Sequence, residues 1–410
     1  MTSYGSLETR GRIGDIGRRG SFASLYVRPE IERFAPGQEE KLAQFLETVA
    51  AATTTARIEG PGDLQLGENG QTLHGGYRYT KSGFFQAARK MAPGLGLLVP
   101  SLAGASVRGN DSTEMMIDGY EARRIWNRIA ELRIAVFRHC ALLRNDTLRQ
   151  IEGVCGANYR VLSNTRFHQA ARELAAGEPV VEFVGAALLG RQLMLWYRRR
   201  QPLFSVEHPG GWWPVHGGYY FMNSESLNAS VRGTVAVYTP AGPCLGPYEQ
   251  LGAKVAHLGK NFDRHLRGML DRVRDAQLPV EALRQGAAAL FIESLGLAPG
   301  ADDRRGAGDG ARNRAGKARE SALINALGQL GVPLRLAREV VDLAIRVGRQ
   351  TTVGPAPPIQ LRSEERRRYM VDLLVPLLRT ARKLDGARRE RLERAAYDIL
   401  VGGFPALRAP

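Results

Sequence analysis

The chain of 410 residues is poor in cysteine and has no long apolar run. Its three cysteines, Cys140, Cys155 and Cys244, are too few and too scattered for a disulfide framework, which fits a reducing compartment. No segment approaches the roughly 18 apolar residues that a membrane-spanning helix needs. Residues 1–6 lack the basic and then apolar layout of a signal peptide. We therefore expect a cytoplasmic protein that does not contact a membrane.

Common catalytic motifs are also absent. There is no G-x-S-x-G, H-E-x-x-H or C-x-x-C sequence. The segment closest to a phosphate-binding loop, 310–317, has one residue too many between its glycines, and Ala318 stands where the magnesium-binding hydroxyl belongs. His257 and His265 lie eight residues apart on a predicted helix. Their separation of about 12 Å along the axis prevents them from sharing a metal ion. We expect no enzymatic activity, no cofactor and no metal site.

Positive charge dominates what is present. Lysine and arginine total 57 against 41 aspartate and glutamate, which gives a formal net charge of +16. Such an excess favours a polyanionic partner, and nucleic acid is the commonest one. Arginine greatly outnumbers lysine, which suits bidentate contact with phosphate, although a GC-rich genome would enrich arginine without a functional cause. The charge therefore predicts a nucleic-acid partner.

The most informative pattern lies in the middle of the chain. Three segments have the composition or the alternation of β-strands, namely residues 191–200, 217–224 and 231–239. A long basic helix is predicted over 248–274. Its apolar residues at helical spacing are Phe262, Leu266, Met269, Leu270 and Val273. The predicted class is α+β, an antiparallel sheet packed against helices and followed by a mostly α-helical C-terminal region.

Composition divides the chain into five parts. A tract rich in glycine and arginine predicts a flexible N-terminal arm, and a low-complexity stretch predicts a linker without a core. The predicted parts are a flexible basic arm (1–35), a mainly helical N-terminal part of the core (36–150), an α+β core (151–299), a disordered linker (300–318) and a helical basic C-terminal region (319–410).

Apolar spacing predicts helices outside the central pattern as well. One covers 80–91 and is capped by Thr80 or Ser82. A long one covers 121–149, and its predicted buried side comprises Ile125, Ile129, Leu132, Val136, Phe137 and Leu142. The C-terminal helix over 366–400 carries many arginines, which acidic neighbours such as Glu390 and Glu393 offset only in part.

A set of aromatic and basic residues is the candidate binding site. Exposed rings would stack on bases, and the cations would neutralise phosphates. The predicted nucleic-acid-binding residues are Trp196, Arg198, Arg200, Trp212, Tyr219, Arg232, Lys254, Lys260, Arg264 and Arg267. The alternative is that the rings fill the core between sheet and helix, as they would in an ordinary α+β domain of a basic protein. Strand alternation requires Trp196 and Tyr197 to face opposite sides.

Several short motifs between residues 75 and 275 resemble those of a known family. They are 79–88 with 95–102, 159–165, 223–226, 235–244 and 253–257. In this order they resemble the threonine-capped helix, central strand, polar turn, cysteine-bearing strand and histidine-bearing helix of the phage/plasmid-like protein family, domain-of-unknown-function family 932. The resemblance implies an origin on a bacteriophage or another mobile element, and it implies no established activity.

The order of three strands and a helix also resembles the core of phage single-strand annealing recombinases, in topology and charge only. We expect a non-enzymatic, homo-oligomeric protein of a bacterial host cell that binds single-stranded nucleic acid, DNA rather than RNA, in recombination or replication. The alternative is a structural or assembly protein of a phage particle, located in the particle, whose basic tail faces the packaged genome. A third reading is an enzyme whose site has no recognisable motif.

Overall fold

The structure is a computed structural model that describes residue 27, residues 31–67, 69–91, 119–156, 159, 161–177, 180–208, 211–226, 230–257 and 261–288, scattered positions between 321 and 338, and residues 370–384 and 386–402. The chain folds into two compact units. Unit 1 comprises residues 1–29 and 52–157, and unit 2 comprises residues 30–51 and 158–410.

The described residues of unit 1 form a four-stranded sheet and two main helices. Its strands are ordered β2 (Thr53–Arg57), β4 (Cys140–Asn145), β5 (Gln150–Gly156) and β3 (Arg78–Tyr79). The described part of the unit also contains the short 3-10 helix η1 (Pro61–Asp63), α2 (Lys81–Met91) and α4 (Gly119–Phe137). The backbone N–H of Gly83 donates to Thr80 Oγ1 at 3.2 Å, so the predicted cap by Thr80 is confirmed.

The predicted helix over 121–149 is wrong beyond Phe137, because residues 140–145 form β4 and pair with β2. The predicted buried side is also wrong for three of its six members. Leu132 is 66% exposed, and Ile125 and Val136 are exposed too. The core instead takes the stripe that contains Trp126, whose ring stacks on Phe84 with centroids 4.4 Å apart. Two apolar stripes share this helix, and spacing alone does not say which one is buried.

Unit 2 is built on a seven-stranded antiparallel sheet. Its order is β1 (Ile31–Phe34), β6 (Val181–Leu189), β7 (Gln192–His208), β8 (Gly211–Ser224), β9 (Val231–Thr239) and β10 (Gly242–Leu245), and β11 (Gly252–Val255) also pairs with β9. The three predicted central strands are confirmed as β7, β8 and β9. Strands β7 and β8 form a long hairpin whose tip lies near Trp212.

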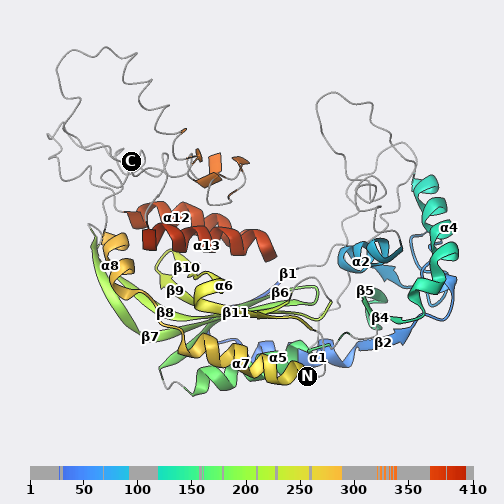
Figure 1. Cartoon of the computed structure of the whole chain (residues 1–410), viewed down its shortest axis with the longest axis horizontal. Helices are drawn as coiled ribbons and strands as arrows, with labels where there is room; N and C mark the ends of the chain where they lie inside the picture. Colours follow the sequence, from blue (N-terminus) through green and yellow to red (C-terminus); the bar gives the residue numbers. More distant parts are fainter. Residues whose placement is uncertain are drawn as a thin grey trace, which may run out of the picture. The chain divides into compact units, whose positions relative to one another are not determined.

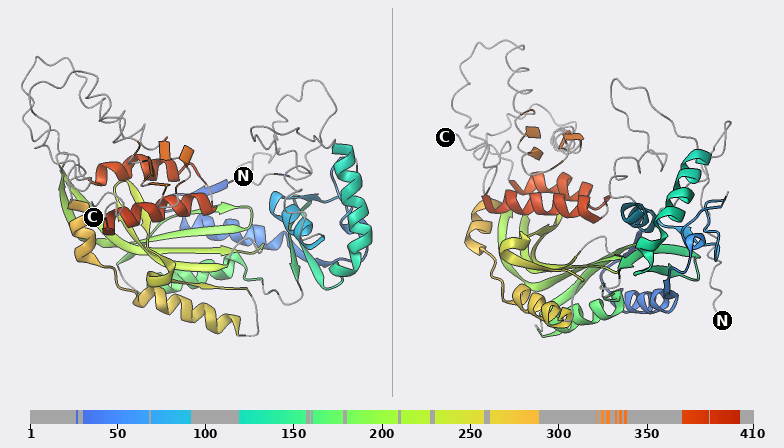
Figure 2. Two further views of the ribbon diagram at one scale, coloured as in Figure 1. Left: turned by 45° about the horizontal axis from the view of Figure 1, so that its top comes forward. Right: turned by 45° about the vertical axis from the view of Figure 1, so that its right-hand side comes forward.

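Helices cover both faces of this sheet (Figures 1 and 2). One face carries Tyr197 and Tyr219 and packs against α1 (Glu39–Ala51), α5 (Asn164–Ala176) and α7 (Phe262–Asp275). The other face carries Trp196 and Tyr220 and lies under α12 (Met370–Ala381) and α13 (Gly386–Gly402). The helix α8 (Val280–Ala288) contacts β7, α12 and α13. The predicted α+β class with a helical C-terminal region is confirmed.

The predicted helix over 248–274 is wrong in its first half. Residues 248–251 form the single turn α6, and residues 252–255 form β11 at the edge of β9. Gly252 permits this pairing, because a Cβ there would lie 2.3 Å from the carbonyl oxygen of Gly233. The second half is confirmed as α7, and all five of its predicted apolar residues are buried.

The units divide the chain differently from the predicted parts. Residues 31–34 form a sheet strand rather than part of the arm, and residues 39–51 belong to unit 2. Residues 52–157 form a separate unit with its own sheet. Within 36–150 the described residues still hold more helix than strand, through α1, α2 and α4. The predicted linker 300–318 and the arm up to residue 26 lie outside the described residues. These differences arise because β1 pairs with β6, and β2 with β4, across long stretches of sequence.

The three thiols are expected to differ in reactivity. Burial raises the pKa of the Cys155 thiol to about 11 and raises the pKa of the Cys244 thiol well above its usual value, whereas Cys140 is only half-buried. The thiolate is the reactive species. In a disulfide-exchange assay at about pH 8, the Cys140 thiol should react rapidly. The thiols of Cys155 and Cys244 should react only as the protein unfolds. Rapid reaction of all three in the folded protein would contradict this packing.

Candidate nucleic-acid interface

The predicted aromatic residues do not form one exposed surface. Trp196 is 4% exposed, and the Arg389 guanidinium of α13 lies 3.9 Å from its ring centroid. Tyr219 is 1% exposed and lies on the opposite face of the sheet. Both rings are therefore unavailable for base stacking, and their assignment as binding residues is wrong. The opposite orientations of Trp196 and Tyr197 are as predicted.

Arg198 and Arg200 lie together on one face, as strand alternation requires, but they share a carboxylate. Arg198 Nε donates to Glu182 Oε1 at 2.9 Å, and Arg200 Nε lies 3.6 Å from Glu182 Oε2. Glu182 stands directly opposite Arg198 in the pairing of β6 with β7. Arg199 points to the other face and donates to the Tyr219 hydroxyl at 2.9 Å. The pair keeps one excess positive charge rather than two.

The predicted cations around Tyr248 have structural partners. Arg232 Nη1 lies 2.9 Å from Glu390 Oε2, and Lys254 Nζ lies 3.3 Å from Glu249 Oε1. Both cations also lie over the Tyr248 ring, at 5.8 and 5.0 Å from its centroid. Lys260 lies outside the described residues. These contacts tie α6 and α13 to the sheet, so they do not indicate a phosphate site.

Trp212 keeps its predicted accessibility. It is 68% exposed and lies at the tip of the β7–β8 hairpin, opposite residue 207 in the register. The neighbouring Trp213 is partly buried against the core. An exposed indole at a hairpin tip costs free energy in water and is suited to stacking on an unpaired base. Trp212 is therefore the ring of the predicted set that remains available.

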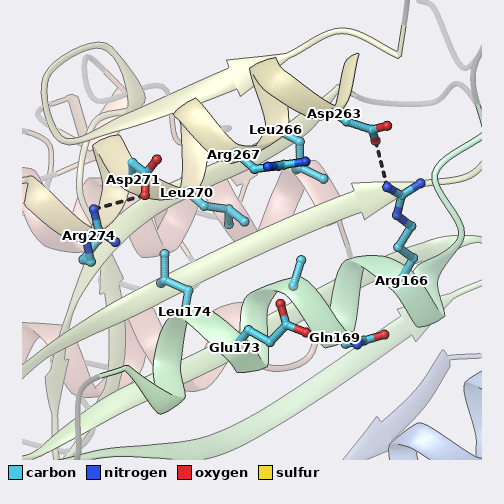
Figure 3. Close-up of a pocket in the computed structure, with 11 residues that line it drawn as sticks. Arg166, Gln169, Glu173, Leu174, Asp263, Leu266, Arg267, Leu270, Asp271 and Arg274 are labelled. Atoms are coloured by element: carbon cyan, nitrogen blue, oxygen red, sulfur yellow. Dashed lines mark hydrogen bonds and ion pairs between the residues drawn. The ribbon is translucent and has the colours of Figure 1, made fainter. Parts of the chain in front are cut away.

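The structure places Arg267, one of the two predicted arginines of α7, in the lining of a groove between α5 and α7, whereas Arg264 is exposed on the same helix outside that lining. The groove has a volume of about 530 Å³. Leu174, Leu266 and Leu270 supply apolar surface, and Arg267 lines the groove from α7 (Figure 3). Arg166 of α5 lies 3.1 Å from Asp263 of α7 and joins the two helices at one end. The groove thus combines an apolar lining with charged walls, in which Arg166, Arg267 and Arg274 face the carboxylates Glu173, Asp263 and Asp271.

The charges of the α7 surface are only partly balanced. Asp271 and Asp275 both bind Arg274, at 3.0 Å each, and Asp263 is taken by Arg166. Arg264, Arg267 and Arg272 are exposed, and no ion pair is described for them within the residues that the structure covers. Two of these three arginines were predicted from the sequence. Arg272 belonged to the same predicted basic helix but was not in the predicted site.

A second hollow adjoins the groove at the C-terminal end of α7. Its volume is about 420 Å³, and Arg274 lines both spaces. Arg199 and Tyr219 contribute the sheet side, and the segment that follows α7 contributes Leu278. The hollow extends the accessible path along α7 toward the β7–β8 hairpin. Arg199 was not in the predicted site, and it lies on the opposite side of β7 from Arg198 and Arg200, as strand alternation predicts.

A buried polar cluster joins three of the segments that carry the family resemblance. The Tyr159 hydroxyl donates to the carbonyl oxygens of Ser224 and Glu225, both at 3.1 Å. Arg191 Nη1 lies 3.2 Å from Glu225 Oε2, and the His257 ring lies 5.1 Å from that of Tyr159. Arg191, Glu225 and His257 are all buried. The cluster therefore stabilises the junction of sheet and α5 and offers no accessible surface.

Comparisons with protein-family models, curated proteins and solved structures found no match to this chain. The resemblance to the phage/plasmid-like family and to annealing recombinases stays a prediction from motifs and topology. In the part of the chain that the structure describes, no group of three or more His, Cys, Asp or Glu side chains is placed to hold a metal ion. The described helices also include none with the length and apolar character needed to cross a membrane.

Proposed function

We propose that this protein binds single-stranded nucleic acid, DNA in preference to RNA, along the groove between α5 and α7. The observation that carries the proposal is the position of Arg267, which lines this groove. Arg264 and Arg272 of the same helix are exposed, and among the described residues none of the three arginines is in an ion pair. Guanidinium groups without a carboxylate partner remain available for phosphate oxygens.

The physical basis of binding is phosphate neutralisation with apolar contacts beneath it. Each phosphate that an arginine neutralises releases condensed counterions, which supplies affinity that falls with salt. Leu174, Leu266 and Leu270 offer apolar surface to bases or sugars. A single strand exposes the faces of its bases, whereas a duplex keeps them stacked and paired, so this surface and the exposed Trp212 favour a single strand. We propose strand handling in recombination or replication of a phage or plasmid as its role.

Reversing two charges of α7 tests the proposal. The variant Arg264→Glu/Arg267→Glu of the full chain should bind labelled single-stranded DNA at least tenfold more weakly than the native protein, because two phosphate contacts become repulsive. The slope of log K against log salt should fall by about 1.4, since each lost contact contributes about 0.7 for single strands. Fluorescence anisotropy with single-stranded DNA, single-stranded RNA and duplex DNA over a salt series measures both quantities.

A matched control separates this site from the overall charge. Arg89 and Arg138 of unit 1 are exposed, and Arg89→Glu/Arg138→Glu changes the net charge by the same amount. This control should retain most of the affinity. Equal losses of affinity in the two variants would mean that binding depends on the overall charge and not on this groove. A slope of log K against log salt near zero for the native protein would contradict nucleic-acid binding altogether. Tighter binding of duplex than of single strands would contradict the proposed preference.

A further inference from the structure

The turn between α12 and α13 carries a cluster of exposed cations on unit 2. Its members are Arg379, Arg382, Lys383, Arg388 and Arg391. The ion pairs that the structure describes for α13 involve other residues, Arg389 with Glu393 and Arg232 with Glu390. Asp385, the carboxylate that the sequence places in this turn, lies outside the described residues. The five cations therefore outnumber this one carboxylate of the turn.

The helix α13 sorts its charges between its two sides. Glu390 and Glu393 are 4% and 1% exposed and face the sheet, where they bind Arg232 and Arg389. Arg388 and Arg391 face solvent. Glu390 and Glu393 therefore do not neutralise the positive charge on the solvent-facing side of α13, although they lie beside these arginines in the sequence. Burial raises the pKa of Glu393, although the neighbouring Arg389 guanidinium opposes the shift.

The position of the cluster at a helix start adds to its attraction for anions. The first turn of α13 contains Arg388 and no acidic residue. The backbone N–H groups of a helix N-terminus favour negative charge, and a cation there is unfavourable unless an anion lies nearby. Arg382 Nη2 donates to the carbonyl oxygen of Ala241 at 2.9 Å, which holds this part of the turn on the β9–β10 connection. The cations are therefore presented on a fixed support.

The helices α12 and α13, which carry the cluster, lie on the opposite face of the sheet from α5 and α7, which form the groove (Figure 2). Tyr220 donates to Glu390 of α13 at 2.8 Å, whereas its neighbour Tyr219 belongs to the core on the α7 side. Because both surfaces belong to unit 2, the sheet between them sets their separation. A nucleic-acid strand that is bound in the groove therefore reaches the α12–α13 turn only by passing around the edge of the sheet.

We infer that the α12–α13 turn is a second binding surface for a nucleic-acid strand, so that one chain holds two strands, or two segments of one strand, on opposite faces of its sheet. The inference rests on the proposed function of the α5–α7 groove. Its ligand is the phosphate backbone, because the surface offers five cations and no exposed ring among its described residues. Two strands on one rigid support suit a protein that brings strands together.

Counting bound strands tests this inference. The full chain is titrated at low salt with a short fluorescent oligothymidylate that is long enough for one surface only. Two strands per chain are expected for the native protein, and one for Arg388→Glu/Arg391→Glu. The same loss is expected for Arg264→Glu/Arg267→Glu, and binding should disappear when all four residues are changed. The neutral variant Arg388→Gln/Arg391→Gln should give a weakened second site. Circular dichroism would show whether charge reversal disturbs folding. In that case the neutral variant still tests the second site.

The possible results separate the two sites. One strand per native chain, lost in the α7 variant and kept in the α13 variant, would overturn the second surface and leave the groove intact. Two strands in both the native protein and Arg388→Glu/Arg391→Glu would also overturn it. Binding that is lost only in Arg388→Glu/Arg391→Glu would overturn the assignment of the groove as a binding site and support that of the α12–α13 turn. The control Arg89→Glu/Arg138→Glu should keep two strands, and a loss there would overturn both assignments in favour of general charge.

Discussion

Replacing Glu390 with alanine is expected to lower the free energy of unfolding by about 3–5 kcal/mol, the usual cost of removing one partner of a buried charged network. Three donors of unit 2 converge on this carboxylate. Tyr220 donates to it at 2.8 Å, Tyr248 donates at 3.2 Å, and Arg232 Nη1 lies 2.9 Å away. Burial, followed by the charge of Glu390, raises the pKa of both tyrosines, so their hydroxyls stay protonated and able to donate.

Urea unfolding of the variant, followed by tryptophan fluorescence, measures this loss, because Trp196 lies under the same helix. The control is Arg388→Ala on the exposed side of α13, which should change the free energy of unfolding by less than about 0.5 kcal/mol. The double variant Glu390→Ala/Arg232→Ala should lose less than the sum of its single variants, since each removes a partner of the other. Similar small losses for Glu390→Ala and Arg388→Ala would contradict the packing of α13 on the sheet.

Replacing Arg191 with methionine is expected to cost a similar amount, about 3–5 kcal/mol, because it leaves the buried carboxylate of Glu225 without its cation. Both side chains are buried, and Nη1 lies 3.2 Å from Oε2. Glu225 also accepts from the backbone N–H of Asn164, the first residue of α5. The side-chain amide of Asn164 in turn donates to the Arg191 carbonyl oxygen at 3.2 Å. The pair therefore positions the start of the helix that forms one wall of the groove.

Thermal unfolding of Arg191→Met, monitored by circular dichroism, tests this expectation. The matched control is Arg166→Met, which breaks the exposed pair with Asp263 and should cost at most about 1 kcal/mol. Arg191→Met/Glu225→Gln should recover part of the stability, because the uncompensated charge is then removed as well. Equal melting temperatures for Arg191→Met and Arg166→Met would show that the buried pair does not stabilise the junction.

Elements with a clear local period were predicted well. All five apolar residues of α7 that were chosen from helical spacing are buried. In β9, Val231, Val235 and Val237 face the α7 side, whereas Tyr238 faces the other. Such patterns follow from the backbone geometry of one segment, 3.6 residues per turn in a helix and two per repeat in a strand. They need no knowledge of what the segment packs against.

Elements that depend on distant partners were not predicted. Residues 140–145 continue an apolar pattern that reads as helix, but they pair with residues 53–57 from far along the chain and become β4. Residues 252–255 carry no strong strand signal, and they become β11 because the edge of β9 is open to them. On α4 the core takes the stripe of Trp126 and leaves Leu132 exposed. In each case pairing or packing with another segment decided between local alternatives.

The sequence by itself determined the charge excess, the α+β class, the three central strands and the exposed arginines of α7, because these depend on composition and local period. Only the tertiary structure decided which of the candidate residues water can reach. Arg389 of α13 covers Trp196, and Glu182 lies between Arg198 and Arg200. Buried Glu390 and Glu393 leave the outer side of α13 more positive than its sequence suggests. Burial and ion pairing join residues that lie far apart in the chain, so exposure is a property of the packed fold.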